Sequence, residues 1–338
     1  MSRPNALLTA TAALIGLTLI AFAVGQFAIS PGDLTTLVWA WISGTPHTLP
    51  ASHDAVIFQI RGPRVLAAIL IGAALSGAGA VYQNMFRNPL VSPDILGVSS
   101  GAALGAVLAI FLALPILAIQ GFAFAGGLVA VALVYFIGNA VRGHDPILAL
   151  ILTGVVVGTL FGSLIALMKT LADPYNQLPA ITFWLLGSLS SISPADLWVA
   201  TPLVLLGLVP IILLRWRMNL LSLSDDEARA LGVDVSRLRL TIVTCATLIT
   251  AAAVAISGII GWIGLLIPHA ARLLVGPQFA RLLPLSLVLG ACYLLAVDTL
   301  ARTMASIEIP PGVLTALIGT PLFLWLLSAT HSRGRDVS

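Results

Sequence analysis

Charge is what this sequence lacks most. Only 9% of its 338 residues are charged, whereas a soluble domain carries about 25%. Hydrophobic residues make up 59%, and the mean hydropathy is +1.07. A chain this apolar would expose larger apolar patches to water than a soluble monomer tolerates. The composition therefore excludes an ordinary soluble domain and makes lipid the solvent for most of the chain.

Cysteine is also scarce, with single copies at Cys245 and Cys292, both inside apolar runs. They make neither a disulfide framework nor a metal pair, so we expect two small buried residues. His47 and His53 lie in a polar stretch that has no partner cysteine or acidic cluster. We therefore predict no metal site in this chain.

Catalytic motifs are missing as well. The sequence has no G-x-x-x-x-G-K-[ST] phosphate loop, no H-E-x-x-H and no nucleophile elbow. The net charge is only +3 despite a pI of 9.2, and no basic stripe with interleaved aromatics indicates nucleic acid. We predict that the chain is not an enzyme and binds no nucleic acid. Energy for any active transport must come from a separate subunit or an ion gradient.

Long apolar runs are what the sequence has in abundance. A membrane span needs about 20 predominantly apolar residues, and ten runs qualify, although the eighth is short. The first run exceeds the roughly 7–15 residues of a signal-peptide core, so we expect it to be retained. The pattern predicts an all-α polytopic membrane bundle. The runs are Ala6–Phe27, Arg61–Tyr82, Ile95–Leu114, Ile116–Asn139, Pro146–Thr170, Asp196–Leu214, Leu238–Ser257, Trp262–Val275, Leu282–Thr303 and Gly312–Ala329.

The basic residues predict the orientation of these spans. With both termini in the cytoplasm, twelve of the 16 basic residues lie inside and four lie outside. This asymmetry satisfies the positive-inside rule. The four outside residues are Arg61, Arg64, Lys169 and Arg302.

The longest cytoplasmic loop, residues 215–239, contains signals for helices. Ser224 and Glu227 have the spacing of a capping box, and Asp225 and Asp226 would lie at the positive end of the helix dipole. Gly232 can end this segment, and Asp234 or Ser236 can cap a second one. We predict two short helices beneath the membrane; an unstructured solvated loop is the alternative.

Several blocks resemble one family of transport proteins. The segment Arg217–Leu240, RMNLLSLSDDEARALGVDVSRLRL, is similar to the cytoplasmic loop of the FecCD/BtuC-type permeases. These are type II ATP-binding-cassette (ABC) importers for iron-siderophore, haem or vitamin B12. The other blocks are RGPRVLA at Arg61–Ala67, YQNMFRNPLVSPDILGVSSGAAL at Tyr82–Leu104, GIIGWIGLLIPHAARLLVG at Gly258–Gly276 and IPPGVLTALIGTPLFL at Ile309–Leu324. The match runs from about Arg61 to the C-terminus, and the first sixty residues match only in character.

The resemblance implies a single BtuC-like permease domain over residues 1–338 in the bacterial inner membrane. It implies a homodimer with a central path, two ATP-binding subunits below, and a periplasmic binding protein above. No cofactor is expected on this chain, because ATP-Mg would bind the partner ATPase. A ferric siderophore or haem is the favoured cargo. Cobalamin and molybdate or tungstate are the alternatives within the family.

The resemblance also implies roles for particular residues. The loop helices would insert into the ATPase, and the expected coupling residues are Ser224, Asp225, Asp226, Glu227, Arg229 and Gly232. Arg61, Arg64 and Arg302 would pair with carboxylates of the binding protein, since a guanidinium makes bidentate contacts. Interfacial snorkelling, or an Asp298–Arg302 pair at helical spacing, is the alternative. The expected path and gate residues are Ile147, Leu148, Thr153, Phe183 and Trp184.

A gradient-driven carrier is the rival class. Such a carrier needs ionisable residues near the middle of the membrane, often at broken helices. Asp298 is the one candidate that the spans provide, and we expect it to form a structural ion pair with Arg302. We expect His269, which follows Pro268, to be a packing residue.

Overall fold

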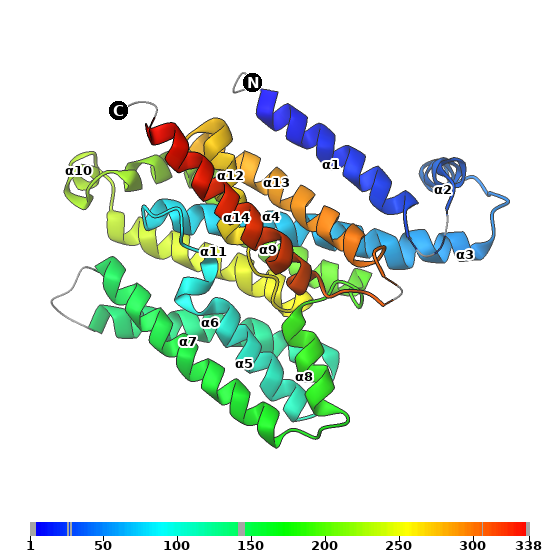
Figure 1. Ribbon diagram of the computed structural model, residues 1–338, viewed down its shortest axis with the longest axis horizontal. Coiled ribbons are helices and arrows are strands. Elements are labelled where there is room, and N and C mark those ends of the chain that lie inside the picture. Colours follow the sequence, from blue (N-terminus) through cyan, green and yellow to red (C-terminus); the bar gives the residue numbers. More distant parts are fainter. Residues whose placement is uncertain (1–4, 26, 28, 141–145, 306, 336–338) are drawn as a thin grey trace.

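The computed structural model describes residues 5–25, 27, 29–140, 146–305 and 307–335, and every element within these ranges is a helix (Figure 1). The all-α fold is therefore confirmed. Eight helices are long and apolar enough to cross a membrane. They are α1 (Asn5–Ala23), α4 (Gly62–Met85), α6 (Ile116–Ala140), α7 (Pro146–Leu171), α9 (Pro194–Met218), α11 (Val235–Ser257), α13 (Phe279–Ala301) and α14 (Pro311–Arg335).

Two shorter helices occupy the remaining predicted spans. They are α5 (Val98–Phe111) and α12 (Ile263–Val275). At 1.5 Å per residue, a helix of 13 residues is about 20 Å long, which is less than the roughly 30 Å of the hydrocarbon core. Both helices are preceded by non-α backbone, since α5 follows the 3₁₀ turn η2 (Pro93–Leu96) and α12 follows residues 258–262. Both therefore begin inside the bundle rather than at its end.

The middle of the bundle is built around α4, which runs between α11 and α13 (Figure 1). In α4, 78% of the most apolar window is buried, against 17–28% in α1, α6, α7 and α9. Glycine permits this packing, because a Cβ at Gly79 would lie 1.9 Å from the carbonyl oxygen of Gly264 in α12. Small residues allow helix backbones in membranes to approach closely.

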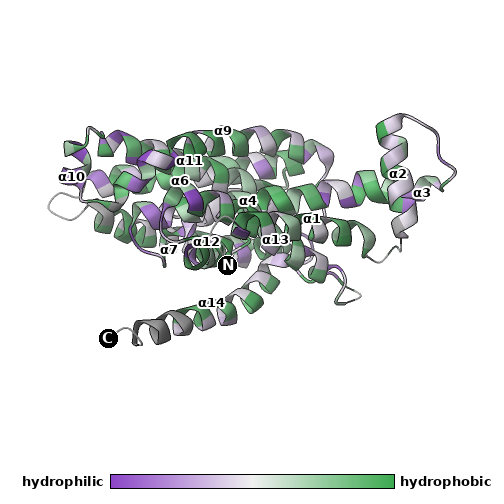
Figure 2. Cartoon of the chain, turned by 90° about the horizontal axis from the view of Figure 1, so that it is seen from above, coloured by the Kyte–Doolittle hydropathy of each residue, from purple (hydrophilic) through white to green (hydrophobic). Residues whose placement is uncertain are grey.

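Short elements cover the two ends of the bundle. At one end lie α2 (Pro31–Ser43), α3 (Ala51–Asp54) and the π-helix η1 (Ala55–Arg61), which leads directly into α4. At the other end lie the 3₁₀ turn η3 (Asn219–Ser222) and α10 (Asp225–Ala230) (Figure 1). Figure 2 shows hydrophobic residues along the long helices and frequent hydrophilic residues around α10 and around α3.

The predicted loop of residues 215–239 needs a correction. α9 continues to Met218, and α11 begins at Val235, so the connection between these helices is shorter than predicted. Only one short α-helix, α10, lies in this connection. The second predicted helix is the first turn of α11, because Asp234 caps a helix that continues without a break into the membrane. Neither α2 nor α8 (Gln177–Leu186) was predicted as a helix.

Candidate functional site

The helix α10 begins with the predicted capping box. The Ser224 hydroxyl accepts a hydrogen bond from the Glu227 backbone N–H at 3.3 Å, and the Glu227 carboxylate accepts one from the Ser224 backbone N–H at 2.8 Å. These bonds satisfy amide groups that the first turn of a helix leaves unpaired. Gly232, with φ of +81°, has the left-handed backbone that follows the helix end. These caps therefore fix where the six-residue helix α10 begins and ends.

Contacts with neighbouring helices hold α10 in place. The Asp225 carboxylate lies 3.4 Å from an Arg87 guanidinium nitrogen and 3.3 Å from an Arg239 nitrogen. Arg87 also donates to the Leu221 carbonyl at 2.8 Å, and Ala228 is buried against the core. Because Arg87 follows α4 and Arg239 lies in α11, α10 is joined to two membrane-spanning helices.

The outer face of α10 has charges with only local partners. The Asp226 side chain is 95% exposed and the Arg229 side chain is 56% exposed, and the two pair at 3.1 Å. Hydrogen bonds from the Ser224 hydroxyl and backbone N–H lower the pKa of Glu227 below its ordinary value, so this carboxyl stays ionised at neutral pH. The result is a rigid, charged surface that is open to a partner.

At the opposite end, two arginines cap the C-terminal end of α1. Arg302 donates to the carbonyls of Ala21 at 2.5 Å and Val24 at 3.0 Å. Arg61 donates to the Phe22 carbonyl at 2.5 Å and to the Phe27 carbonyl. The last carbonyls of a helix have no partner within it and favour a nearby positive charge. Both arginines therefore attach α1 to η1 and α13.

Arg64 lies in the same cluster between two carboxylates. Its guanidinium group is 2.9 Å from Asp298 and 2.7 Å from Glu308. Asp298 is fully buried and also lies 3.6 Å from Arg302, so the predicted Asp298–Arg302 pair is present. Glu308, which the sequence analysis did not select, is an additional member. It precedes a Pro-Pro turn outside any span, and only the fold brings it to Arg64.

The burial of these arginines limits how they could dock another protein. Arg61 is 4% exposed, and Arg64 and Arg302 are each 7% exposed. A carboxylate from a binding protein would have to displace internal partners to reach them. Docking by these residues stays a prediction, and the geometry itself supports a role in holding α1, α4 and α13 together.

The predicted path residues lie on two helices. Leu148, in α7, is exposed, whereas Thr153 one and a half turns further along is buried. Phe183 is exposed on α8, and Trp184 is half-buried. The side chain of Ile147 lies outside the described residues. One face of α7 therefore presents apolar side chains outward. Such a face is compatible with contact to a second subunit, to a translocation path or to lipid.

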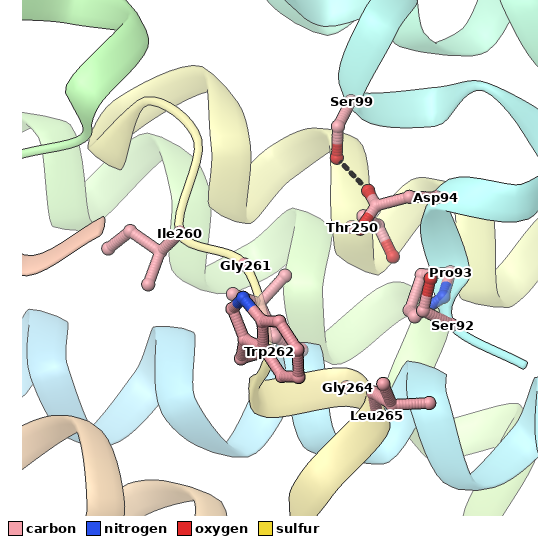
Figure 3. A pocket seen from close by; sticks show the side chains of 11 residues that line it. Ser92, Pro93, Asp94, Ser99, Thr250, Ile260, Gly261, Trp262, Gly264 and Leu265 are labelled. Atoms are coloured by element: carbon pink, nitrogen blue, oxygen red, sulfur yellow. Dashed lines mark hydrogen bonds between the residues drawn. The ribbon is translucent and has the colours of Figure 1, made fainter. Parts of the chain in front are cut away.

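A second carboxylate, that of Asp94, was not selected from the sequence. Asp94 lies in η2 and lines a small cavity with Ser92, Ser99, Thr250 and Trp262 (Figure 3). The third span was predicted to begin at Ile95, which left Asp94 in the preceding loop. The sequence did hold one signal for this residue, because Asp94 follows Pro93 directly before the apolar run that starts at Ile95.

The comparisons with known proteins agree with this architecture. A model of the FecCD transport family matches residues 13–329. The chain is 39% identical to the molybdate import system permease protein MolB of Haemophilus influenzae over 95% of each chain. It is 40% identical to the hemin transport system permease protein HmuU of Yersinia pestis, over 82% of this chain and 85% of that one.

A solved structure described as a metal-chelate type ABC transporter in an inward-facing conformation is also similar. Its TM-score is 0.87 at 38% sequence identity, and the match covers 96% of this chain and 99% of that chain. The resemblance therefore extends over nearly the whole fold, including the first sixty residues that the sequence blocks left unmatched.

The family match and the similar solved structure, which both cover most of this polytopic bundle, identify it as the membrane-spanning subunit of an ABC importer. The chain belongs to the FecCD transport family, whose members are permeases of type II importers. Such a subunit is not catalytic and carries no cofactor, because the partner ATPase binds ATP. This membership decides against the gradient-driven carrier that the sequence alone left open.

Proposed function

We propose that this chain forms the translocation path of an importer for a ferric siderophore or haem in the bacterial inner membrane. Two copies would pair around the path, with two ATPase subunits at the α10 end and a periplasmic binding protein at the α2 end. The observation that carries this proposal is α10 itself. It is a capped helix fixed to α4 and α11, and its Asp226, Glu227 and Arg229 side chains face outward.

The orientation follows from charge. Among the described side chains, basic residues gather at the α10 end, where helices α9 and α12 finish and α11 and α13 start. We therefore propose that this end faces the cytoplasm, together with both termini, because that orientation satisfies the positive-inside rule. The list at this end is Arg87, Arg215, Arg217, Arg229, Arg237, Arg239, Arg272 and Arg281.

The proposed mechanism is mechanical. Closure of the ATPase dimer on ATP would move α10, and the Asp225 ion pairs with Arg87 and Arg239 would pass this movement to α4 and α11. Rigid elements can transmit such movements because packed helices shift as units. A loop without caps or ion pairs would absorb the same displacement.

The cargo is proposed on narrower support. The relatives at 39% and 40% identity are permeases for molybdate and for hemin, so overall identity does not rank these cargoes. We favour an iron chelate because of its frequency in the family; cobalamin and molybdate or tungstate are the alternatives. A bulky chelate needs a wide path that binds it weakly. The described part of α7 fits this, since Lys169 in the last turn is its one charged residue.

Transport in proteoliposomes tests the coupling role. The permease with Glu227→Arg and Arg229→Glu would be reconstituted with its ATPase and binding protein, and ATP-driven uptake would be measured. We expect uptake to fall at least about tenfold, because the charges that face the ATPase are reversed. Arg237→Ala is the control, since Arg237 is an exposed residue at the same end that pairs only with Asp234. Unchanged uptake by the double variant contradicts the coupling role.

A ligand screen of the cognate binding protein tests the cargo separately. The protein would be titrated with ferric siderophores, haem, cobalamin, molybdate and tungstate, and heats of binding would be measured. Saturable binding of a ferric siderophore or haem supports the proposed cargo. Binding of cobalamin or an oxyanion alone replaces it without affecting the ABC assignment.

A further inference from the structure

The Asp94 carboxylate lines a small cavity in the connection between α4 and α5. The cavity is also bordered by Leu75, midway along α4, and by Thr250, in the C-terminal half of α11. Asp94 is an exposed residue. The carboxylate therefore faces a space that can hold a compensating partner.

The protein itself supplies little compensation for this charge. Among the described residues, Asp94 has one hydrogen-bond donor, the Ser99 hydroxyl, and no arginine, lysine or histidine within ion-pair distance. Asp298, in α13, differs in this respect, because it contacts Arg64 and Arg302. The exposed Asp94 carboxylate therefore has no positive partner among the described side chains and is open to an ion from solution.

The backbone around the cavity is strained and tightly fixed. Trp262 has φ of +71°, which is rare for a bulky residue, at the point where residues 258–262 lead into α12. Such strain persists only where the surroundings enforce it, and it is frequent at ligand sites. A Cβ on Gly264 would lie 2.7 Å from Pro93, so α12 and η2 touch directly. The cavity is a built feature between two interrupted helical segments.

The polar side chains that line the cavity mostly offer oxygen atoms, and Asp94 is the one acid among the lining residues. Ser92, Ser99 and Thr250 contribute hydroxyl groups, Asp94 contributes a carboxylate, and residues 260–262 contribute non-helical backbone (Figure 3). Thr250 donates its own proton to the Ala246 carbonyl, so its oxygen lone pairs stay available. Neutral oxygens with a single carboxylate suit a hard cation of low charge, whereas divalent sites usually gather more carboxylates.

The size of the cavity sets the size of its occupant. Its interior volume is about 20 Å³, and a cavity of about 10–15 Å³ holds one water-sized particle. A metal chelate is far too large. A bare cation of about the size of Na⁺ fits, and one positive charge would neutralise Asp94.

We propose that the Asp94 cavity is a binding site for one small monovalent cation, which bridges η2 to the link between α11 and α12. Unwound backbone between helices coordinates cations in other membrane proteins. The site is independent of the transported cargo and of the coupling role of α10. Its occupation joins the start of α5 to the start of α12.

Sodium binding to the intact permease–ATPase complex tests the proposal. The complex would be purified in N-methylglucamine chloride, and equilibrium binding of radioactive sodium would be measured by scintillation proximity. We expect saturable binding that approaches one ion per permease chain. The thermal unfolding midpoint should rise with sodium at constant ionic strength, since a ligand stabilises the state that binds it. Competition by K⁺ at the same site also supports the proposal.

Substitutions locate the site. Asp94→Asn should weaken sodium binding at least about tenfold, whereas Asp54→Asn, which changes the last residue of α3, should leave binding unchanged. Thr250→Val keeps the shape of the side chain and removes one oxygen, so it should weaken binding about twofold to tenfold. The Thr250→Val variant therefore still tests the site if the Asp94→Asn protein does not fold.

Three results would overturn the proposal. Absence of saturable sodium binding, with equal midpoints in sodium and N-methylglucamine, leaves the cavity to water or to a protonated Asp94. Sodium binding that survives both Asp94→Asn and Thr250→Val places the ion elsewhere. Binding of Mg²⁺ without binding of sodium contradicts a monovalent site.

Discussion

At the α10 end of the bundle Asp226 and Arg229 point to solvent, whereas the three arginines Arg61, Arg64 and Arg302 at the α2 end are buried inside the chain. Within the described part of the chain, Asp226 and Arg229 form an ion pair with each other alone, and both are largely exposed. Arg61, Arg64 and Arg302 are at most 7% exposed, and carbonyls and carboxylates of other helices surround them. These two side chains at the α10 end are therefore free to contact a partner, whereas the three arginines at the α2 end hold the membrane-spanning helices together.

The largest effect should come from the centre of the buried cluster. Asp298→Ala leaves Arg64 and Arg302 without their shared carboxylate, and breaking a buried ion pair in this way costs about 3–5 kcal/mol. Chemical unfolding of the purified permease in detergent would measure this loss. Glu308→Ala is the matched control and should cost less, because Glu308 is 39% exposed and, among the described residues, forms an ion pair with Arg64 alone. Equal losses for the two variants would show that burial does not separate them.

Next in size is the attachment of α1. Arg302→Ala removes both donors from the Ala21 and Val24 carbonyls, and bonds from a charged donor contribute about 1.5–3 kcal/mol. We expect faster hydrogen exchange near the end of α1, while α7, which lies elsewhere in the bundle, keeps its protection. Arg302→Lys should restore only part of the protection, since an ammonium lacks the guanidinium fork. Unaltered exchange at α1 would contradict the capping role.

A smaller and local effect is expected at the cap of α10. Ser224→Ala removes the side chain that accepts from the Glu227 N–H, and loss of an N-cap costs about 1 kcal/mol. Hydrogen exchange of α10 should accelerate while the global unfolding midpoint stays the same. Ser224→Asp, which keeps an acceptor at the cap, should retain protection. If both variants behave alike, the capping box does not stabilise α10.

The same cap predicts a dependence on pH. The pKa of Glu227 is lowered in the folded protein, first by the Ser224 hydroxyl and then by the Ser224 N–H. A lowered carboxyl pKa stabilises the fold above the unfolded pKa, about 4.3 for glutamate, and this stability is lost as pH falls through the lower folded value. Protection of α10 from exchange should be constant between pH 7 and about pH 5 and decline in more acidic solution. Glu227→Gln should remove this decline.

The smallest effect on stability is expected on the exposed face of α10. Arg229→Ala breaks a surface pair with Asp226, so the free energy of unfolding should change by less than about 0.5 kcal/mol. Association with the ATPase at low salt should nevertheless weaken, because the exposed charge faces that partner. A large loss of stability would show that the exposed face of α10 stabilises the fold, as the buried arginines at the α2 end do.

Much of the fold was predictable because it depends on local patterns. The ten apolar runs correspond to ten helices, and Ser224, Glu227 and Gly232 take the places that their spacing predicts. The second helix of the loop was wrong because a cap signal at Asp234 says where a helix starts and not how far it continues. α2 was missed because its polar surroundings and short length hid it among loop residues.

The site residues were predictable only where their partners are close in sequence. Asp298 and Arg302 are one turn apart, so their pair was foreseen. Arg64 and Asp298 are 234 residues apart, and nothing in the local pattern joins them. Asp94 was overlooked for the same reason, since its cavity is assembled from α4, η2, α11 and α12.

The sequence by itself determined that this protein is a helical membrane bundle with a capped, charged helix at one end. Hydrophobicity, caps and charge asymmetry act within about one span, and their free energies do not depend on distant segments. Only the tertiary structure decided that the outer arginines bond inward and that Asp94 faces a cavity without a counter-charge. Those outcomes depend on which groups from distant parts of the sequence lie within a few ångströms of these side chains, and the packing of the helices alone determines which groups those are.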